Sequence, residues 1–171
     1  MAKPERIVLI GMMGVGKSRV GRALAARLGW PLLDNDALIQ QATGRDGPTI
    51  FREGGEDALH EAEGQALVEA TRGSGPAVVT VAGSVADDEP LRATLRGAGR
   101  IVWLRAPVAT LHQRIAAGRG RRADAVDEDL LARLSAEREP RYRAVADLIV
   151  DVVDRPVDAI VDEILAWTPE A

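Results

Sequence analysis

Short, continuously apolar runs alternate along the chain with longer stretches whose apolar residues recur roughly every three or four positions. The short runs predict buried strands, because hydrophobicity without alternation indicates a strand covered on both faces. The longer stretches predict amphipathic helices; Val20, Leu24 and Leu28, for example, would share one helix face. The predicted strands are Arg6–Ile10, Pro31–Leu33, Ala77–Val81, Ile101–Leu104 and Leu148–Val152. The predicted helices are Gly16–Leu28, Glu56–Thr71, Glu89–Leu95, Val108–Ala116, Asp129–Ala146 and Val157–Trp167.

This order of elements predicts an α/β fold. Repeated strand–helix–strand units imply a parallel, doubly wound sheet with right-handed crossovers and helices on both faces, which makes three layers. The 171 residues contain no low-complexity linker, so residues 1–171 are expected to form a single domain.

Composition narrows the chemistry that this fold can carry. There is no cysteine, which excludes a disulfide scaffold, a thiolate metal site and a cysteine nucleophile. His60 and His112 are the only histidines, which excludes a multi-histidine metal centre. A net charge of −4 and an aromatic content of 3% argue against nucleic acid or an anionic membrane as the main partner. No apolar run approaches the roughly 20 residues of a membrane span, and no signal-peptide pattern is present, so a cytoplasmic protein is expected.

The strongest motif follows the first predicted strand, where Gly11–Ser18 matches the P-loop pattern G-x-x-x-x-G-K-[ST]. Its glycines let successive backbone N–H groups converge on phosphate oxygens, and the following helix directs its positive dipole end at the same anion. Lys17 is expected to reach the β- and γ-phosphates, and the Ser18 hydroxyl to bind Mg²⁺. The residues expected to contact the nucleotide phosphates are Gly11, Gly14, Val15, Gly16, Lys17, Ser18 and Arg19.

A P-loop occurs in kinases, GTPases and motors alike. A GTPase needs a guanine-reading N-K-x-D motif, and neither Lys3 nor Lys17, the only lysines of the chain, stands in one. Motors and AAA-type ATPases need far larger domains. A small-molecule kinase is therefore the class that the sequence favours.

The polar segment Gly118–Asp129 combines glycines, arginines and acidic residues. Such a composition is typical of a solvated surface loop. The alternative is a mobile lid that lays arginine side chains over an anionic substrate, and charge alone leaves both interpretations open.

From residue 10 onward the sequence resembles the shikimate kinases, within the nucleoside-monophosphate-kinase-like P-loop fold. The resemblance covers nearly the whole chain and is carried by Ile10–Asp57 and Ala136–Asp151. It implies a five-stranded parallel sheet in the order 2-3-1-4-5, an acceptor-binding region at residues 34–63 and a LID loop at about residues 117–128. It also implies transfer of the γ-phosphoryl group of ATP to a ring hydroxyl of shikimate, a step of aromatic amino acid biosynthesis.

Two acidic residues after the second predicted strand, Asp34 and Asp36, match the family's D-x-D motif. The resemblance implies that Asp34 holds Mg²⁺ through water, and that Asp36 contacts the acceptor hydroxyl and can act as a base. The alternative is that this pair caps a helix, which Asp36 alone could do for a helix from Ala37 onward.

Matches elsewhere in the chain imply further nucleotide contacts. Arg114 corresponds to the arginine that stacks on adenine, and Pro156 lies where the family has a proline beside the purine. Arg121 corresponds best to the LID arginine, an arginine finger in cis, with Arg119 and Arg122 as competitors. The family's R-P-L-L motif is absent and the loop is shorter, which leaves the choice among these three arginines open.

The acceptor half departs from the family in two places. His60 replaces an arginine that would grip the shikimate carboxylate; a mostly neutral imidazole has no bidentate geometry, and losing such a contact costs about 1.5–3 kcal/mol. The Gly-Gly-Gly turn after the third strand becomes Ala82–Ser84, where only Gly83 lets the backbone approach a ligand closely. Arg138 matches the family's second carboxylate-binding arginine. The expected acceptor-binding residues are Asp36, His60, Gly83 and Arg138.

The leading hypothesis is a Mg²⁺-dependent kinase that uses ATP to phosphorylate a hydroxyl of a small polyhydroxylated acid, with shikimate as the first expected acceptor. Lys17, Asp36 and Arg121 are its expected catalytic residues. The alternatives are a kinase for a different polyol or hydroxy acid, and a nucleotide-binding paralogue that has lost transfer activity and acts through a partner. The expected partner is a small molecule, with no nucleic acid and no membrane, and the chain is expected to act as a monomer.

Overall fold

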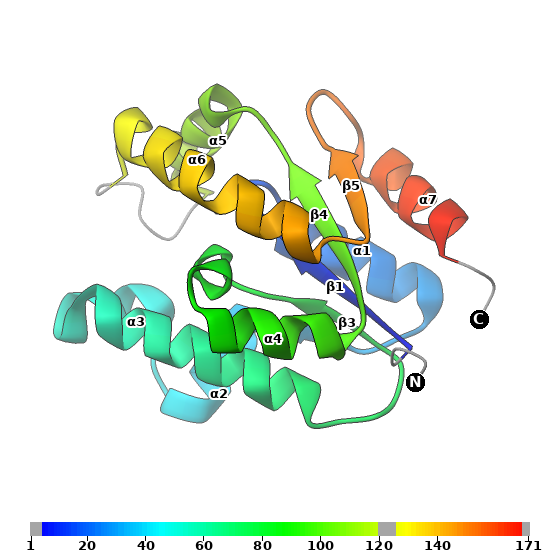
Figure 1. The fold of residues 1–171 in the computed structure, drawn as a ribbon, viewed down its shortest axis with the longest axis horizontal. Helices are drawn as coiled ribbons and strands as arrows, with labels where there is room; N and C mark the ends of the chain where they lie inside the picture. The colour runs from blue at the N-terminus through cyan, green and yellow to red at the C-terminus, as the bar shows by residue number, and fades with distance from the viewer. Residues whose placement is uncertain (1–4, 120–125, 169–171) are drawn as a thin grey trace.

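A computed structural model describes residues 5–119 and 126–168 of the chain. One parallel sheet forms the middle layer, and helices cover both of its faces (Figure 1). The strands are β1 (Arg6–Ile10), β2 (Leu32–Asp34), β3 (Ala77–Thr80), β4 (Arg100–Arg105) and β5 (Leu148–Asp151). The α-helices are α1 (Lys17–Leu28), α2 (Asn35–Thr43), α3 (Gly47–Thr71), α4 (Glu89–Ala98), α5 (Val108–Arg114), α6 (Glu128–Val145) and α7 (Val157–Trp167). A 3₁₀ helix, η1 (Gly83–Asp87), and a π-helical turn, η2 (Ile115–Arg119), complete the described elements.

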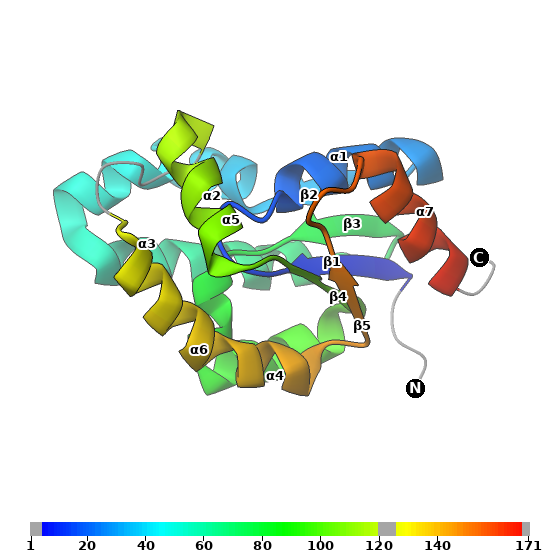
Figure 2. The same cartoon turned by 90° about the horizontal axis from the view of Figure 1, so that it is seen from above.

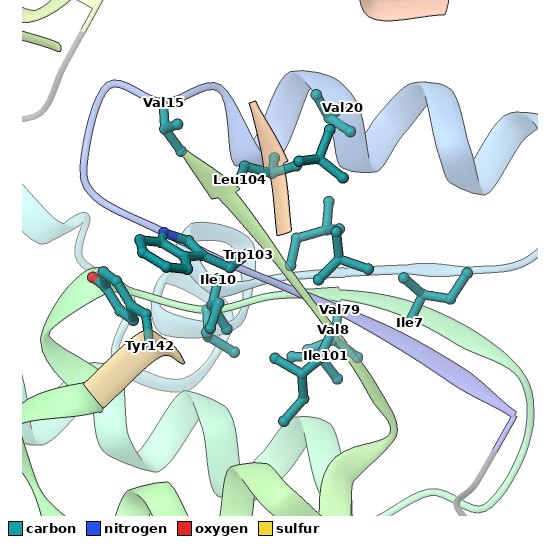
Figure 3. Packing of buried hydrophobic residues seen from close by; sticks show 14 of the residues in the cluster. Ile7, Val8, Ile10, Val15, Val20, Val79, Ile101, Trp103, Leu104 and Tyr142 are labelled. Atoms are coloured by element: carbon teal, nitrogen blue, oxygen red, sulfur yellow. The ribbon is translucent and has the colours of Figure 1, made fainter. Parts of the chain in front are cut away.

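The five strands follow the order β2-β3-β1-β4-β5 and every neighbouring pair is parallel, which confirms the predicted topology. β1 lies in the middle of the sheet, with Val8 aligned to Val79 of β3 and to Ile101 of β4. These three side chains are buried and pack together at the centre of the sheet (Figure 3). The continuous apolar run in β1 follows from this position, because both faces of a central parallel strand are covered.

The helices form two layers around the sheet. α1 and α7 pack together on one face, and α4 and α6 lie on the opposite face (Figure 2). Trp103 of β4 is buried against Tyr142 of α6, with ring centroids 5.6 Å apart (Figure 3). No helix within the two described ranges is both long enough and apolar enough to cross a membrane.

The apolar pattern does not predict α2, and it places β2 one residue too early. β2 extends to Asp34, which is also the N-cap of α2 and accepts a hydrogen bond from the Asp36 N–H. The interpretation of Asp36 as the helix cap is therefore wrong, because Asp36 already lies in the first turn. Ile39 and Asn35 are the buried residues of this short helix, too few to produce a helical period in the sequence.

The first part of α3 is also absent from the prediction. Asp46 caps this helix by accepting a hydrogen bond from the Thr49 N–H, and Gly55 interrupts it with φ 77° and ψ −168°. The interruption breaks the apolar period, which explains why the sequence predicts a helix only from Glu56. α2 and α3 share a small core of their own, formed by Ile39, Ile50, Leu59 and Ala66.

The close contact between α1 and the sheet generates a stability prediction. A Cβ at Gly21 would lie 2.9 Å from Thr80 Cγ2, whereas a Cβ at the exposed helical Gly97 of α4 would meet open space. Gly21→Ala should lower the free energy of unfolding by about 1–3 kcal/mol, because the helix or the strand must shift. Gly97→Ala should raise it by about 0.4–1 kcal/mol through the unfolded state. Urea denaturation of both variants measures the two changes, and a loss of stability in both would contradict this packing.

Candidate active site

The phosphate loop joins the end of β1 to the start of α1, at the carboxyl edge where parallel α/β sheets bind ligands. Gly14 and Gly16 have φ values of 80° and 101°, a left-handed conformation that favours glycine. Gly16 is also the N-cap of α1 and has no side chain, so the N–H groups of the first helical turn are available to an anion. A Cβ at Gly11 would lie 2.5 Å from the Leu104 carbonyl oxygen, so glycine also lets the loop lie directly against β4.

Two cationic side chains border this loop. The Lys17 ammonium donates to the carbonyl oxygens of Gly11 at 2.7 Å and Met12 at 3.1 Å, which holds it over the loop. Arg114 of α5 also lies against the loop, and its Nη1 donates to the Val15 carbonyl at 3.0 Å. The positive charge and the available N–H groups suit the loop to a polyphosphate.

A single carboxylate, Asp34, connects the loop to the two neighbouring strands. Its Oδ1 accepts hydrogen bonds from Ser18 Oγ and from Thr80 Oγ1, both at 2.8 Å, and its Oδ2 accepts one from the Asp36 N–H at 3.2 Å. Ser18 and Asp34 therefore place a hydroxyl and a carboxylate oxygen side by side, as the predicted metal site requires. Within residues 5–119 and 126–168, no three His, Cys, Asp or Glu side chains cluster as a metal site.

The expected acceptor region lies where α3, η1 and α6 meet. Arg138 of α6 is buried and binds Asp87 of η1, with its Nη2 donating to Oδ2 at 2.8 Å. The pKa of the Arg138 guanidinium is raised: burial lowers it, but hydrogen bonds and charge from Asp87 outweigh that effect. Buried Glu63 of α3 accepts a hydrogen bond from the Ser84 hydroxyl. Glu63 and Asp87 therefore each bind a polar side chain of the acceptor region.

The Tyr142 hydroxyl joins α6 to η1 beside this region. Tyr142 of α6 donates its phenolic hydrogen to the Gly83 carbonyl at 3.0 Å, and burial raises the pKa of this phenol. A Cβ at Gly83 would lie 3.0 Å from the Tyr142 oxygen, so a larger residue there would have to displace the Tyr142 side chain slightly.

One cavity of about 530 Å³ connects the two halves of the site. On the nucleotide side it is lined by the phosphate loop, Arg114 and the β5–α7 connection, and on the acceptor side by Asp36 and Arg138. A larger groove of about 1030 Å³ is lined by α2, α3, η1 and the start of α4. His60 and Ser84 line both the groove and the cavity. The groove is lined by neither the phosphate loop nor Asp36, so the smaller cavity is the candidate active site.

The residues predicted from the sequence take the following places. The cavity lining includes Gly14, Val15, Gly16, Lys17, Ser18, Arg19, Asp36, His60, Gly83, Arg114 and Arg138. Pro156 is the N-cap of α7, and its neighbours Arg155 and Val157 line the cavity. Arg121 and its competitor Arg122 lie outside the described residues, as does the middle of the proposed LID, so these assignments stay predictions.

Four residues that sequence reasoning did not assign to the site contribute to it. Thr80 binds Asp34, Glu63 binds Ser84, and Asp87 binds Arg138, while Arg155 lines the nucleotide side. A signal for Thr80 existed, since a polar residue at the end of a buried strand points to this edge of the sheet. Asp87 carried no such signal, because nothing local in the sequence reveals a partner on α6.

This chain is similar in sequence and in structure to known shikimate kinases. The shikimate kinase family model matches residues 13–169. The chain is 37% identical over 168 residues to a shikimate kinase of Pseudomonas syringae pv. tomato, covering 97% of each sequence. It resembles a shikimate kinase from Acinetobacter baumannii, solved in complex with shikimate, with a TM-score of 0.86, 33% identity and coverage of 95% of this chain and 91% of that chain. A gluconokinase from Sinorhizobium meliloti is a more distant likeness, with a TM-score of 0.62, 27% identity and coverage of 97% and 92%.

The position of Thr80 beside Asp34 generates a binding prediction. Thr80→Val removes the hydroxyl that holds Asp34 Oδ1, and Mg²⁺-dependent binding of ATP should weaken about tenfold, as is typical when a residue that orients a metal ligand is lost. Thr80→Ser keeps the hydroxyl and should bind as the unsubstituted chain does. Calorimetric titration with ATP, with and without Mg²⁺, measures the effect. An equal loss in both variants would show that the methyl group, rather than the hydroxyl, is what matters.

Proposed function

The chain belongs to the shikimate kinase family, and from this membership we propose that it transfers the γ-phosphoryl group of ATP to a ring hydroxyl of shikimate, giving shikimate 3-phosphate and ADP. The observation that supports this most directly is the single cavity lined by both Lys17 of the phosphate loop and Arg138 of the acceptor region. Phosphoryl transfer needs donor and acceptor in line within one space, because its catalysis is mainly positioning and charge stabilisation.

The phosphate loop would bind the triphosphate. Its N–H groups and the first turn of α1 would hold the phosphate oxygens, and Lys17 would leave the Gly11 and Met12 carbonyls to pair with the β- and γ-phosphates. Arg114, which already contacts the loop, would cover the adenine side together with the β5–α7 connection around Pro156.

The residues near Asp34 fit a magnesium ion. Mg²⁺ prefers oxygen ligands and commonly takes one or two from the protein, with waters and phosphates completing the shell. Ser18 Oγ would be a direct ligand and Asp34 would act through water, a proposal supported by the 2.8 Å hydrogen bond that places these two oxygens side by side. When bound, the ion would neutralise charge on the β- and γ-phosphates.

Asp36 would orient the acceptor hydroxyl and accept its proton as the new O–P bond forms and the bond to the β,γ-bridging oxygen breaks. Its carboxylate is exposed in the first turn of α2 and receives a hydrogen bond from Asn35 Nδ2 at 3.2 Å. Arg121 remains the proposed LID arginine that would neutralise the transferring group, with Arg119 and Arg122 as competitors. We also propose that the chain acts in the cytoplasm as a monomer.

The departures in the acceptor half favour a second candidate, a kinase for a related polyol or hydroxy acid. His60 stands where a carboxylate-binding arginine is expected, and its Nε2 lies 3.5 Å from Glu56 Oε1. ADP release, measured with shikimate and with gluconate as acceptors, separates the two candidates. Activity with gluconate alone would favour the second, and ATP binding without ADP from either would favour a paralogue that has lost transfer activity.

A first variant tests the phosphate loop. Lys17→Met should reduce kcat for ADP formation about 100-fold or more, because it removes a positive charge positioned for the transition state. Arg27→Gln removes a positive charge from the exposed end of the same helix, where Arg27 pairs with Asp162, and should leave kcat unchanged. Equal activity in the two variants would remove the basis for the proposed mechanism.

A second variant tests the missing guanidinium. His60→Arg should lower KM for shikimate about tenfold or more, because it would restore a charge-assisted contact to the substrate carboxylate. His112→Arg, the same substitution on α5 at a residue that lines neither space, serves as the control. A KM that does not change in His60→Arg would show that this contact does not limit acceptor binding.

A further inference from the structure

Asp87 lies between two arginines of α6. Arg138 Nε donates to both carboxylate oxygens, at 3.2 and 3.1 Å, and Arg138 Nη2 donates to Oδ2 at 2.8 Å. Arg141 Nη1 donates to Oδ1 at 2.8 Å. The geometry follows from the helix, since residues three apart on α6 share one face, and both arginines reach Asp87 at the end of η1. Figure 1 shows α6, which carries both arginines.

The two ion pairs of Asp87 differ in burial. The Arg138 side chain is 5% exposed, whereas those of Asp87 and Arg141 are 32% and 39% exposed. A buried guanidinium needs a partner because its desolvation is costly, while an exposed pair is screened by water. The contact with Arg138 is therefore the stronger of the two, and Arg141 shares the Asp87 carboxylate through Oδ1.

This contact occupies the edge of Arg138 that best recognises a carboxylate. The Nε–Nη2 edge of a guanidinium binds a carboxylate in bidentate fashion, and here that edge faces Asp87. The remaining Nη1 lies toward the phosphate loop and Gly83, 3.9 Å from Met12 Sδ and 3.3 Å from where a Gly83 Cβ would be. A carboxylate of an acceptor would have to bind through Nη1 and the second Nη2 hydrogen, on a guanidinium whose charge Asp87 already partly neutralises, or displace Asp87.

Other acidic side chains near Arg138 also disfavour the binding of an acceptor carboxylate. Glu63 is buried nearby and adds to the negative field that raises the pKa of Arg138. Asp36 and Glu56 line the same cavity, and the arginine expected at position 60 is a histidine. In the acceptor half, the Arg138 guanidinium is therefore already bound to an internal carboxylate and lies among several acidic side chains.

We propose that Asp87 is a specificity-determining residue, which competes with the acceptor carboxylate for Arg138 and so reduces the preference of this site for a charged acceptor over its uncharged analogue. The inference rests on the proposed function for the ring and hydroxyls of the acceptor. It concerns how strongly the site distinguishes a carboxylate from a neutral group at the same place.

The test compares the affinities of shikimate and its methyl ester, which differ by one negative charge, by calorimetric titration. Asp87→Asn should raise the ratio of the shikimate affinity to the methyl ester affinity about three- to tenfold. This size lies between the small effect of a solvent-screened ion pair and the larger effect of a buried charged hydrogen bond. Affinity for ATP should not change. Asp57→Asn removes the same charge from an exposed position of α3 and should leave the ratio unchanged.

A second variant keeps the test valid if Asp87→Asn is poorly folded. Arg141→Gln leaves Asp87 to Arg138 alone, so the ratio should fall slightly below that of the unsubstituted chain. A ratio that stays constant or falls in Asp87→Asn would show that Asp87 only holds Arg138 in place, and would overturn the inference. So would a failure of folded Asp87→Asn to bind shikimate. Selective binding of shikimate without ADP formation by the unsubstituted chain would count against the proposed function alone.

Discussion

The candidate site depends on one carboxylate that joins three segments of the sheet edge. Asp34 ends β2, caps α2, and accepts hydrogen bonds from Ser18 of the phosphate loop and Thr80 of β3. Parallel strands bring their carboxyl ends to one edge, so residues far apart in the chain meet there without a dedicated loop. Because both oxygens of Asp34 are held, the polar corner where a metal and phosphates would bind is already positioned by the fold.

The two halves of the cavity are built on different principles. The candidate nucleotide half combines backbone N–H groups and a helix N-terminus, shaped by glycines, with the side chains of Lys17 and Arg114. The acceptor half relies on side chains, and there polar side chains bind one another, with Arg138 on Asp87 and Ser84 on Glu63. Selectivity in such a region is set by competition between internal and external partners for the same donors.

Sequence reasoning succeeded where the determining signal is local. The five strands and the phosphate loop followed from apolar runs and from Gly11–Ser18, because burial and glycine spacing are properties of short segments. The strand order was implied by the resemblance to the shikimate kinases, and the sheet confirms it. It failed at α2 and at the start of α3, where few apolar residues and the break at Gly55 hide the helical period. It also missed Asp87, because its pairing with Arg138 joins residues 51 apart and only the packing of η1 on α6 reveals it. The roles carried over for Arg121, Asp36 and His60 depend on ligands and on a segment beyond the described residues, so they remain predictions.

The close contact between Gly11 and the Leu104 carbonyl couples the position of the phosphate loop to that of β4. The loop begins where the backbone of β1 lies against the Leu104 carbonyl of β4, at a distance that leaves no room for a side chain. A larger residue there would have to push two central strands apart before it could alter the loop. The shape of the anion-binding loop therefore depends on the spacing between β1 and β4. A mutation that changes the packing of β4 would alter the loop, and with it the binding of an anion, without contacting the anion itself.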